Sequence, residues 1–167
     1  ASDVYKRQKY SWVDKGSSYL LSDVLAAMLY AQLESEEVIK EKRSKLTDAY
    51  MELLTPYSEK KDVNVFQLQP YVKVNHHAFW VIFDTIEHKM EFMNKLKEKD
   101  IYAYIGYLPL HSAPYGLKLG YKPTDLPLTE DYGNRIVRLP FYTELADVGL
   151  DYTINTMKAV LIELYGY

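Results

Sequence analysis

Cysteine is absent from the 167 residues of this chain. Its absence excludes disulfide bonds, thiolate zinc sites, iron–sulfur clusters and a cysteine nucleophile. Any chemistry that the chain supports must therefore rest on other side chains or on a cofactor.

Long apolar runs and an excess of one charge are absent as well. Lys and Arg number 20 and Asp and Glu 23, which gives a net charge of −3. This balance predicts no broad basic face, so we do not expect nucleic acid as a partner. No apolar run approaches the roughly 18 residues of a membrane span, and the N-terminal residues lack the apolar core of a signal peptide. We expect no membrane partner and a cytoplasmic location.

Tyrosine, by contrast, is abundant, with 17 among the 167 residues. Apolar residues make up 48% of the chain and charged residues 26%, which is typical of a folded domain and not of a disordered chain. The length fits one domain with a real core. A single-stranded nucleic-acid binder would also be rich in aromatics, but it would need a basic groove beside them.

Apolar residues at three- and four-residue spacing predict four helices. The hydroxyl of Ser22 is a suitable cap for the first, which has an Ala-rich face, and Ser35 is predicted to cap the second. Pro56 and the polar stretch 58–64 predict the end of that second helix. The four predicted helices span residues 22–33, 35–57, 86–99 and 150–164.

Three strands are predicted between and after these helices. Residues 78–83 form a continuous apolar run that is rich in aromatic and β-branched side chains, and residues 101–105 and 136–139 are shorter runs of the same kind. The intervening residues 106–127 contain the prolines and glycines of a long ordered loop with room for a brief helix. The predicted fold class is α/β, a small sheet with packed helices.

The histidines do not form a recognisable metal site. His76 and His77 are adjacent and would point to opposite faces of a strand, and neither His88 nor His111 is paired with an acid or a histidine at zinc-site spacing. We expect no metal. The chain also lacks a nucleophile elbow, a phosphate-binding glycine loop and a dinucleotide fingerprint.

Two segments remain as candidates for ligand contact. Residues 10–20 place a glycine, hydroxyls and aromatics directly before a helix N-terminus, where hydroxyls and free amides can hold a phosphate. Their aromatics would alternatively cover the core. Residues 106–114 form a proline-stiffened turn after a strand and present Tyr107 and His111. His111 would alternatively hydrogen-bond a loop carbonyl.

An ordered series of motifs extends from Lys9 almost to the C-terminus. The main ones are Lys9-Tyr10-Ser11-Trp12-Val13-Asp14, Gly16-Ser17-Ser18-Tyr19-Leu20, Tyr30-Ala31-Gln32-Leu33-Glu34, Asn75-x-His77-x-Phe79, Tyr107-x-Pro109-Leu110-His111-Ser112-x-Pro114, Asp125-Leu126-Pro127, Thr129-Glu130 and Arg138-Leu139-Pro140. Through them the chain resembles the pyridoxal-phosphate-dependent sugar-nucleotide aminotransferases of the DegT/DnrJ/EryC1/StrS type. Each motif alone is common, and their order carries the resemblance.

The resemblance implies that the chain is the C-terminal portion of a fold-type I enzyme. Residues 1–8 would be a tail or an artefactual boundary, residues 9–34 the end of the large domain with an interdomain helix, and residues 35–167 the small C-terminal α/β domain. The lysine that binds the cofactor would belong to the preceding part, so this chain alone is expected to be inactive. The helix from Ser22 would then expose an apolar face.

Four site residues follow from the same resemblance. Ser18 occupies a position from which relatives contact the cofactor phosphate of the neighbouring subunit in a homodimer. Tyr19, Tyr107 and His111 would contact the sugar nucleotide. Gly106 departs from the family, which usually has a histidine there.

The implied reaction transfers an amino group from glutamate to the 4-keto carbon of a dTDP-4-keto-6-deoxy sugar, with pyridoxal phosphate as cofactor. Such reactions supply amino sugars for surface polysaccharides. The alternative is a non-catalytic α/β binding module that has kept only the small-domain surface.

Overall fold

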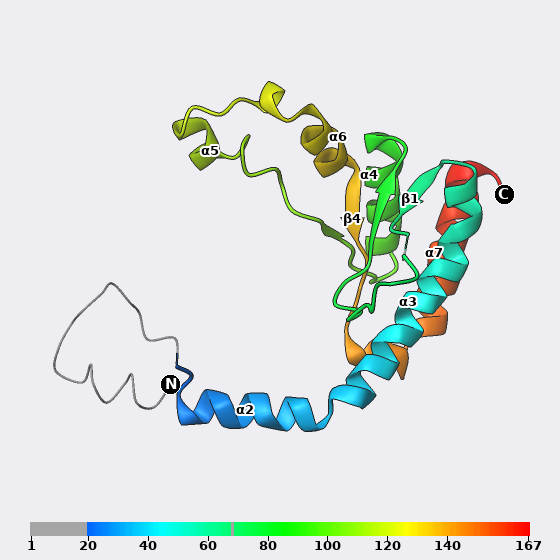
Figure 1. Ribbon diagram of the computed structural model, residues 1–167. Coiled ribbons are helices and arrows are strands. Elements are labelled where there is room, and N and C mark those ends of the chain that lie inside the picture. The colour runs from blue at the N-terminus through cyan, green and yellow to red at the C-terminus, as the bar shows by residue number, and fades with distance from the viewer. Residues whose placement is uncertain (1–19, 68) are drawn as a thin grey trace. The chain divides into compact units, whose positions relative to one another are not determined.

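The computed structural model describes residues 20–67 and 69–167 (Figure 1). The chain divides into two compact units, Ala1–Glu36 and Glu37–Tyr167. We describe each unit by itself.

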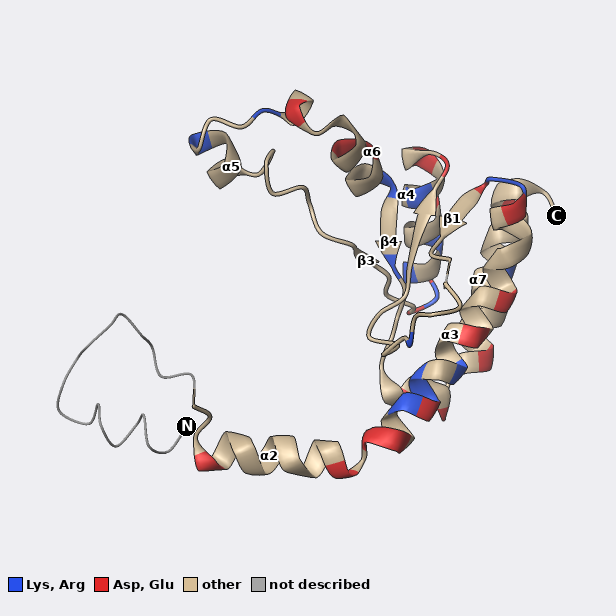
Figure 2. Cartoon of the chain, viewed as in Figure 1, with Lys and Arg blue, Asp and Glu red and all other residues tan. Residues whose placement is uncertain are grey.

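The described part of the first unit is dominated by helix α2, Asp23–Glu34. As predicted, the Ser22 hydroxyl caps it by accepting a hydrogen bond from the Leu25 amide at 3.4 Å. Charged residues stand only at the two ends of α2 (Figure 2). None of its residues is buried, which confirms the predicted exposed apolar face. That face includes Val24, Leu25, Met28, Leu29 and Leu33.

The second unit is built on a four-stranded antiparallel sheet with the order β1-β2-β4-β3. Its strands are β1 (Val63–Val65), β2 (Trp80–Phe83), β3 (Tyr104–Ile105) and β4 (Ile136–Arg138). β2 and β3, which follow one another in the chain, are separated in the sheet by β4. The α/β class with a small sheet and packed helices is confirmed.

The two faces of this sheet differ in character. Val81 and Val137 are paired across β2 and β4 and are completely buried in the core. Because neighbouring residues in a strand point to opposite faces, Trp80, Arg138 and Tyr104 lie together on the other face. Trp80 and Arg138 remain partly accessible to solvent and Tyr104 largely so.

Three helices supply most of the remaining core: α3 (Glu36–Glu59), α4 (Ile86–Lys97) and α7 (Leu150–Tyr165). Each turns an apolar stripe toward the inner face of the sheet. Their charged residues of both signs lie mixed on the outside, most visibly along α3 (Figure 2). The central core residues of the helices are Leu46, Tyr50, Leu54, Phe92, Leu96, Met157 and Leu161.

Residues 106–135, which we call the arm, connect β3 to β4 (Figure 1). The arm contains helix α5 (Pro114–Lys118), the 3-10 turn η1 (Pro123–Asp125) and helix α6 (Pro127–Arg135). Prolines stand in the first turn of all three, where the missing amide hydrogen has no helical partner to lose. A further 3-10 turn, η2 (Thr143–Ala146), precedes α7.

Several predicted boundaries are wrong. Helix α3 continues through Pro56 to Glu59, and Ser35 closes α2, donating its hydroxyl to the Ala31 carbonyl at 3.5 Å. The predicted strands at 78–83, 101–105 and 136–139 shorten to β2, β3 and β4. Strand β1 and helix α6 were not predicted, because β1 spans three residues and α6 follows directly on a proline- and glycine-rich stretch. None of the helices in the described ranges is long and apolar enough to cross a membrane.

Candidate functional site

Tyr107 and Arg138 form a contact at the start of the arm. Tyr107 follows β3 with a positive φ of 70°, and its side chain is 78% exposed. Nη1 of Arg138 donates a hydrogen bond to the Tyr107 hydroxyl at 3.3 Å, and the guanidinium carbon lies 5.4 Å from the centroid of the tyrosine ring. The hydrogen bond and the cation–π contact therefore fix the Tyr107 ring and the Arg138 guanidinium relative to each other.

Gly106 leaves room for this arrangement. A Cβ atom at Gly106 would lie 3.2 Å from Cγ of Arg138 and 3.3 Å from the side chain of Ile136. A larger residue, such as the histidine that the family usually has there, would force the Arg138 stem to move. The departure at Gly106 is thus coupled to the position of Arg138.

His111 lies in different surroundings further along the arm. It is only 7% exposed, and its Nε2 lies 3.2 Å from Oε1 of Glu130 on α6. Neither ring nitrogen has a hydrogen-bond partner of suitable geometry among the described residues, and neither does Oε1 of Glu130. The alternative that His111 bonds a loop carbonyl is therefore wrong. Three polar atoms are thus buried here without a hydrogen-bond partner among the described residues, an arrangement that costs free energy.

Two glycines lock the turn that carries His111. The position of a Cβ on Gly116 would be 2.3 Å from the Leu110 carbonyl oxygen and 2.4 Å from that of His111. On Gly133 it would be 2.8 Å from Cγ of Pro109. Both helices of the arm therefore touch the turn through positions that admit no side chain.

A largely apolar hollow of about 650 Å³ opens beside His111. It lies between the turn, α5 and the start of α6, and Tyr107 does not line it. The structure therefore places Tyr107 and His111 in two separate environments. The residues that line the hollow are Leu110, His111, Ala113, Tyr115, Gly116, Leu119, Tyr121, Leu126 and Thr129.

The other predicted site residues, Ser18 and Tyr19, lie outside the described residues. Arg138 and Glu130, on the other hand, contact the predicted residues Tyr107 and His111 and received no role from the sequence. Both residues stand in motifs that carry the family resemblance, Arg138-Leu139-Pro140 and Thr129-Glu130. The sequence therefore marked these positions but did not indicate which side chains they would contact.

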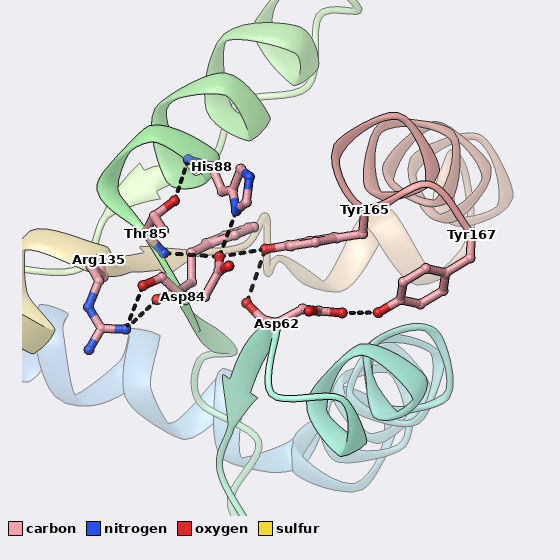
Figure 3. Close-up of polar contacts among 8 residues, drawn as sticks. Asp62, Asp84, Thr85, His88, Arg135, Tyr165 and Tyr167 are labelled. Atoms are coloured by element: carbon pink, nitrogen blue, oxygen red, sulfur yellow. Dashed lines mark hydrogen bonds and ion pairs between the residues drawn. The ribbon is translucent and has the colours of Figure 1, made fainter.

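A second polar cluster gathers at the opposite end of the sheet around Asp84 (Figure 3). Its Oδ1 faces Nδ1 of His88 at 2.8 Å and accepts hydrogen bonds from the Thr85 amide and the Tyr165 hydroxyl, each at 2.9 Å. Arg135 donates to the Phe83 carbonyl and pairs with the Asp131 carboxylate. The cluster joins β2, α4, α6 and α7.

The chemistry of this second cluster is structural. Burial acts to raise the pKa of Asp84, but the hydrogen bonds from His88 and Tyr165 outweigh it and hold the pKa below its usual value. Burial, with Asp84 close by, raises the pKa of the Tyr165 phenol. The hydroxyl of Tyr165 therefore stays protonated and serves as a donor.

Comparison with known proteins agrees with the motifs. The model of the DegT/DnrJ/EryC1/StrS aminotransferase family matches residues 2–158. The chain belongs to this family. Among curated relatives, MJ1066 of Methanocaldococcus jannaschii is 25% identical over 96% of the chain, and GDP-perosamine synthase of Escherichia coli O157:H7 is 26% identical over 86%.

Solved structures of aminotransferases share the fold of this family member. Spr1654 of Streptococcus pneumoniae in its PMP form superposes with a TM-score of 0.78 and 21% identity over 96% of the chain. S. venezuelae DesV, in complex with a ketimine intermediate, superposes with a TM-score of 0.77 and 23% identity over 92% of the chain. The chain spans only 44% and 37% of the length of the two curated relatives, and 41% and 40% of the two structures.

Pyridoxal phosphate is the cofactor of this aminotransferase family. A lysine that forms a Schiff base with this cofactor needs a free amine that faces an open site. Lys89 is buried, and burial lowers its pKa, as in amine nucleophiles. Its Nζ, however, donates to the Asn134 carbonyl at 2.8 Å, and Lys89 lines neither the hollow beside His111 nor the Tyr107 contact. Lys89 is therefore engaged in the fold and faces neither candidate site.

Proposed function

We propose that this chain is the C-terminal part of a sugar-nucleotide aminotransferase, in which it orients the substrate and completes a homodimer. The observation that supports the proposal most strongly is the family match over residues 2–158, combined with a span of only 37–44% of the length of the curated relatives. In this proposal residues 9–34 end the large domain and residues 35–167 form the small domain.

The proposed reaction moves an amino group from glutamate to the 4-keto carbon of a dTDP-4-keto-6-deoxy sugar. The motifs resemble those of the transaminase that makes dTDP-4-amino-4,6-dideoxygalactose for enterobacterial common antigen, and this resemblance supports the proposed reaction. Pyridoxal phosphate, when bound, supplies the electron sink of the reaction. The side chains that we propose for substrate contact are Tyr19, Tyr107 and His111, and Ser18 would donate to the cofactor phosphate of the neighbouring subunit.

The exposed apolar face of α2 supports the proposal from the structure. A helix without one buried residue and with Leu25, Met28 and Leu29 accessible needs a partner surface in a soluble protein. The preceding part of an aminotransferase would provide that surface.

The decisive experiment begins with the DNA upstream of the coding segment. An open frame that encodes a Ser-Phe-His-x-x-Lys type motif is expected. The longer protein should then form a coloured complex with pyridoxal phosphate and aminate a dTDP-4-keto-6-deoxy sugar with glutamate as donor, whereas this chain alone should do neither. A start codon directly before this segment, with no such frame, would contradict the proposal.

A non-catalytic binding module is the second candidate, and the separate core of Glu37–Tyr167 favours it. Such a module would be a stable monomer that binds a sugar nucleotide without pyridoxal phosphate. Titration of the purified chain with a dTDP-sugar and with pyridoxal phosphate distinguishes the two functions.

A further inference from the structure

The outer face of the sheet presents an arginine between aromatic side chains. Arg138 is paired directly with Trp80 on β2 and with Tyr104 on β3. Directly opposed residues of neighbouring strands share a face, so the Arg138 side chain lies on the same face as these two aromatic residues, in the strand between theirs. Tyr107 adds a third ring through the hydrogen bond and the cation–π contact.

Arg138 forms no ion pair with an acid of the described residues. Among the residues that the structure describes, no carboxylate lies within 4.0 Å of its guanidinium, although the group is partly buried. Arg135, three residues earlier, is different: it pairs with Asp131 and donates to the Phe83 carbonyl, and so serves the fold. A partly buried guanidinium that has no carboxylate partner is suited to bind an anion from a ligand.

The space beside Arg138 could hold such an anion. A hollow of about 680 Å³ reaches from the guanidinium along the β3 edge to the start of α7. Lys99 and His77 also line it, against one acid, Asp100. Phenol rings make up much of its remaining wall, from Tyr102, Tyr104, Tyr142 and Tyr152.

The hydrogen bond to Tyr107 also orients Arg138. A guanidinium has five N–H donors in a planar fork, and the Tyr107 hydroxyl occupies one of its nitrogens, Nη1. The remaining donors can engage two oxygens of a phosphate or a carboxylate side by side. Tyr107 is held in a left-handed backbone conformation that a tyrosine rarely adopts, a feature common at ligand sites.

We propose that Arg138 anchors an oxyanion of the ligand, and that Tyr107 orients it. The inference rests on the proposed function, which offers two sources of such a group: the diphosphate of the nucleotide sugar and the carboxylate of the amino donor. Both present two coplanar oxygens to the same fork.

The test compares four versions of the complete chain: wild type, Arg138→Gln, Arg138→Lys and Lys158→Gln. Lys158 is an exposed residue of α7 and provides the matched loss of one positive charge. Each ¹⁵N-labelled protein is titrated with inorganic pyrophosphate, with dTDP and with L-glutamate, and the arginine Nε–Hε signals are followed. Thermal unfolding of each variant shows whether its fold is intact.

We expect pyrophosphate and at least one of the other two probes to shift the Arg138 signal. Arg138→Gln should weaken binding about tenfold or more, since it removes charge-assisted hydrogen bonds. Arg138→Lys should recover part of the loss, because it restores the charge without the fork, and Lys158→Gln should bind as the wild type does. Equal affinity of the folded Arg138→Gln variant, or no binding of any probe by the wild type, overturns the proposal.

The probes also separate this proposal from the proposed reaction. Tighter binding of dTDP than of pyrophosphate, lost in Arg138→Gln, identifies the nucleotide diphosphate as the source, and a glutamate response identifies the donor carboxylate. If pyrophosphate binds through Arg138 while dTDP gains nothing over it, the oxyanion anchor stands and the dTDP-sugar assignment fails.

Discussion

The hydroxyl of Tyr165, in the last turn of α7, lies 2.9 Å from Oδ1 of Asp84 and 3.0 Å from the carbonyl oxygen of Asp62. One proton is thus shared between the end of β2 and the residue before β1 (Figure 3). Through this hydroxyl, α7 is hydrogen-bonded next to β1 and next to β2, at two residues that are far apart in the sequence.

Removing this hydroxyl should weaken the attachment of α7 to the strands while the aromatic ring stays packed. Tyr165→Phe is expected to lower the free energy of unfolding by about 1–2 kcal/mol, because it removes one hydrogen bond from each of two acceptors, which keep their other partners. Urea denaturation followed by circular dichroism measures the change. Tyr71→Phe is the control, since Tyr71 is 85% exposed and should tolerate the same substitution without effect. Equal midpoints for the two variants would show that the shared proton contributes nothing.

The stability of the chain should depend on pH through Asp84. Because hydrogen bonds from His88 and Tyr165 outweigh the effect of burial, the pKa of Asp84 is lower in the folded than in the unfolded chain. The ionised carboxylate therefore stabilises the fold above the ordinary aspartate pKa of about 4, and this stabilisation is lost as the pH falls through the lower, folded value. The free energy of unfolding of the wild type should accordingly decline more steeply in acid than that of Asp84→Asn. Parallel curves from pH 7 to pH 3 would rule out this linkage.

The arm should be sensitive to a single methyl group at Gly116. Gly116→Ala places a carbon closer than 2.5 Å to two carbonyl oxygens of the turn that carries His111, so α5 must move away from the turn. Overpacking of this kind typically costs about 1–3 kcal/mol. Hydrogen exchange is expected to speed up in residues 109–119 and to stay unchanged in α3 and α7. Lys118→Ala, an exposed change in the same helix, should leave the exchange of the arm as it is.

His111 and Glu130 should behave as a coupled pair. Either single change, His111→Gln or Glu130→Gln, alters one side of the close contact between His111 Nε2 and Glu130 Oε1, so the double variant should lose less stability than the two single variants together. A coupling energy of about 1 kcal/mol is expected from a double-mutant cycle in urea. Strict additivity would mean that the 3.2 Å approach between the two side chains carries no energy.

The exposed face of α2 should make the isolated chain associate with itself. Met28→Glu introduces a charge into the middle of that face and should shift the chain toward monomer in sedimentation velocity. Gln32→Glu adds the same charge at a polar position of the same helix and serves as the control. A wild-type chain that sediments as a single monomer and melts in one sharp transition would argue against an unsatisfied surface.

The sequence predicted elements whose signal is local and repeated. Helices α4 and α7 carry apolar stripes over three or more turns, and both form within a few residues of the predicted bounds. Strand β1 could not be predicted, because three residues show no period and acquire their conformation only by pairing with β2.

The candidate site shows the same limit. The turn predicts Tyr107 and His111 as candidates, but their partners depend on long-range arrangements that no local pattern contains. Glu130 reaches His111 from α6, a helix that was not predicted, and Arg138 meets Tyr107 because of the register between β3 and β4. Ser18 and Tyr19 remain predictions.

The attachment of the arm has a consequence for how members of such a family can diverge. β3 and β4 are neighbours in the sheet, with Ile105 opposite Val137. The arm therefore begins and ends at adjacent positions of the same pair of hydrogen-bonded strands. Neighbouring strands are only about 5 Å apart, so a segment inserted there can change its length or sequence while the strands beneath it keep their pairing. Evolution can thus exchange the arm as one contiguous segment, and a protein engineer can graft the arm of one relative onto the sheet of another at the same two joints.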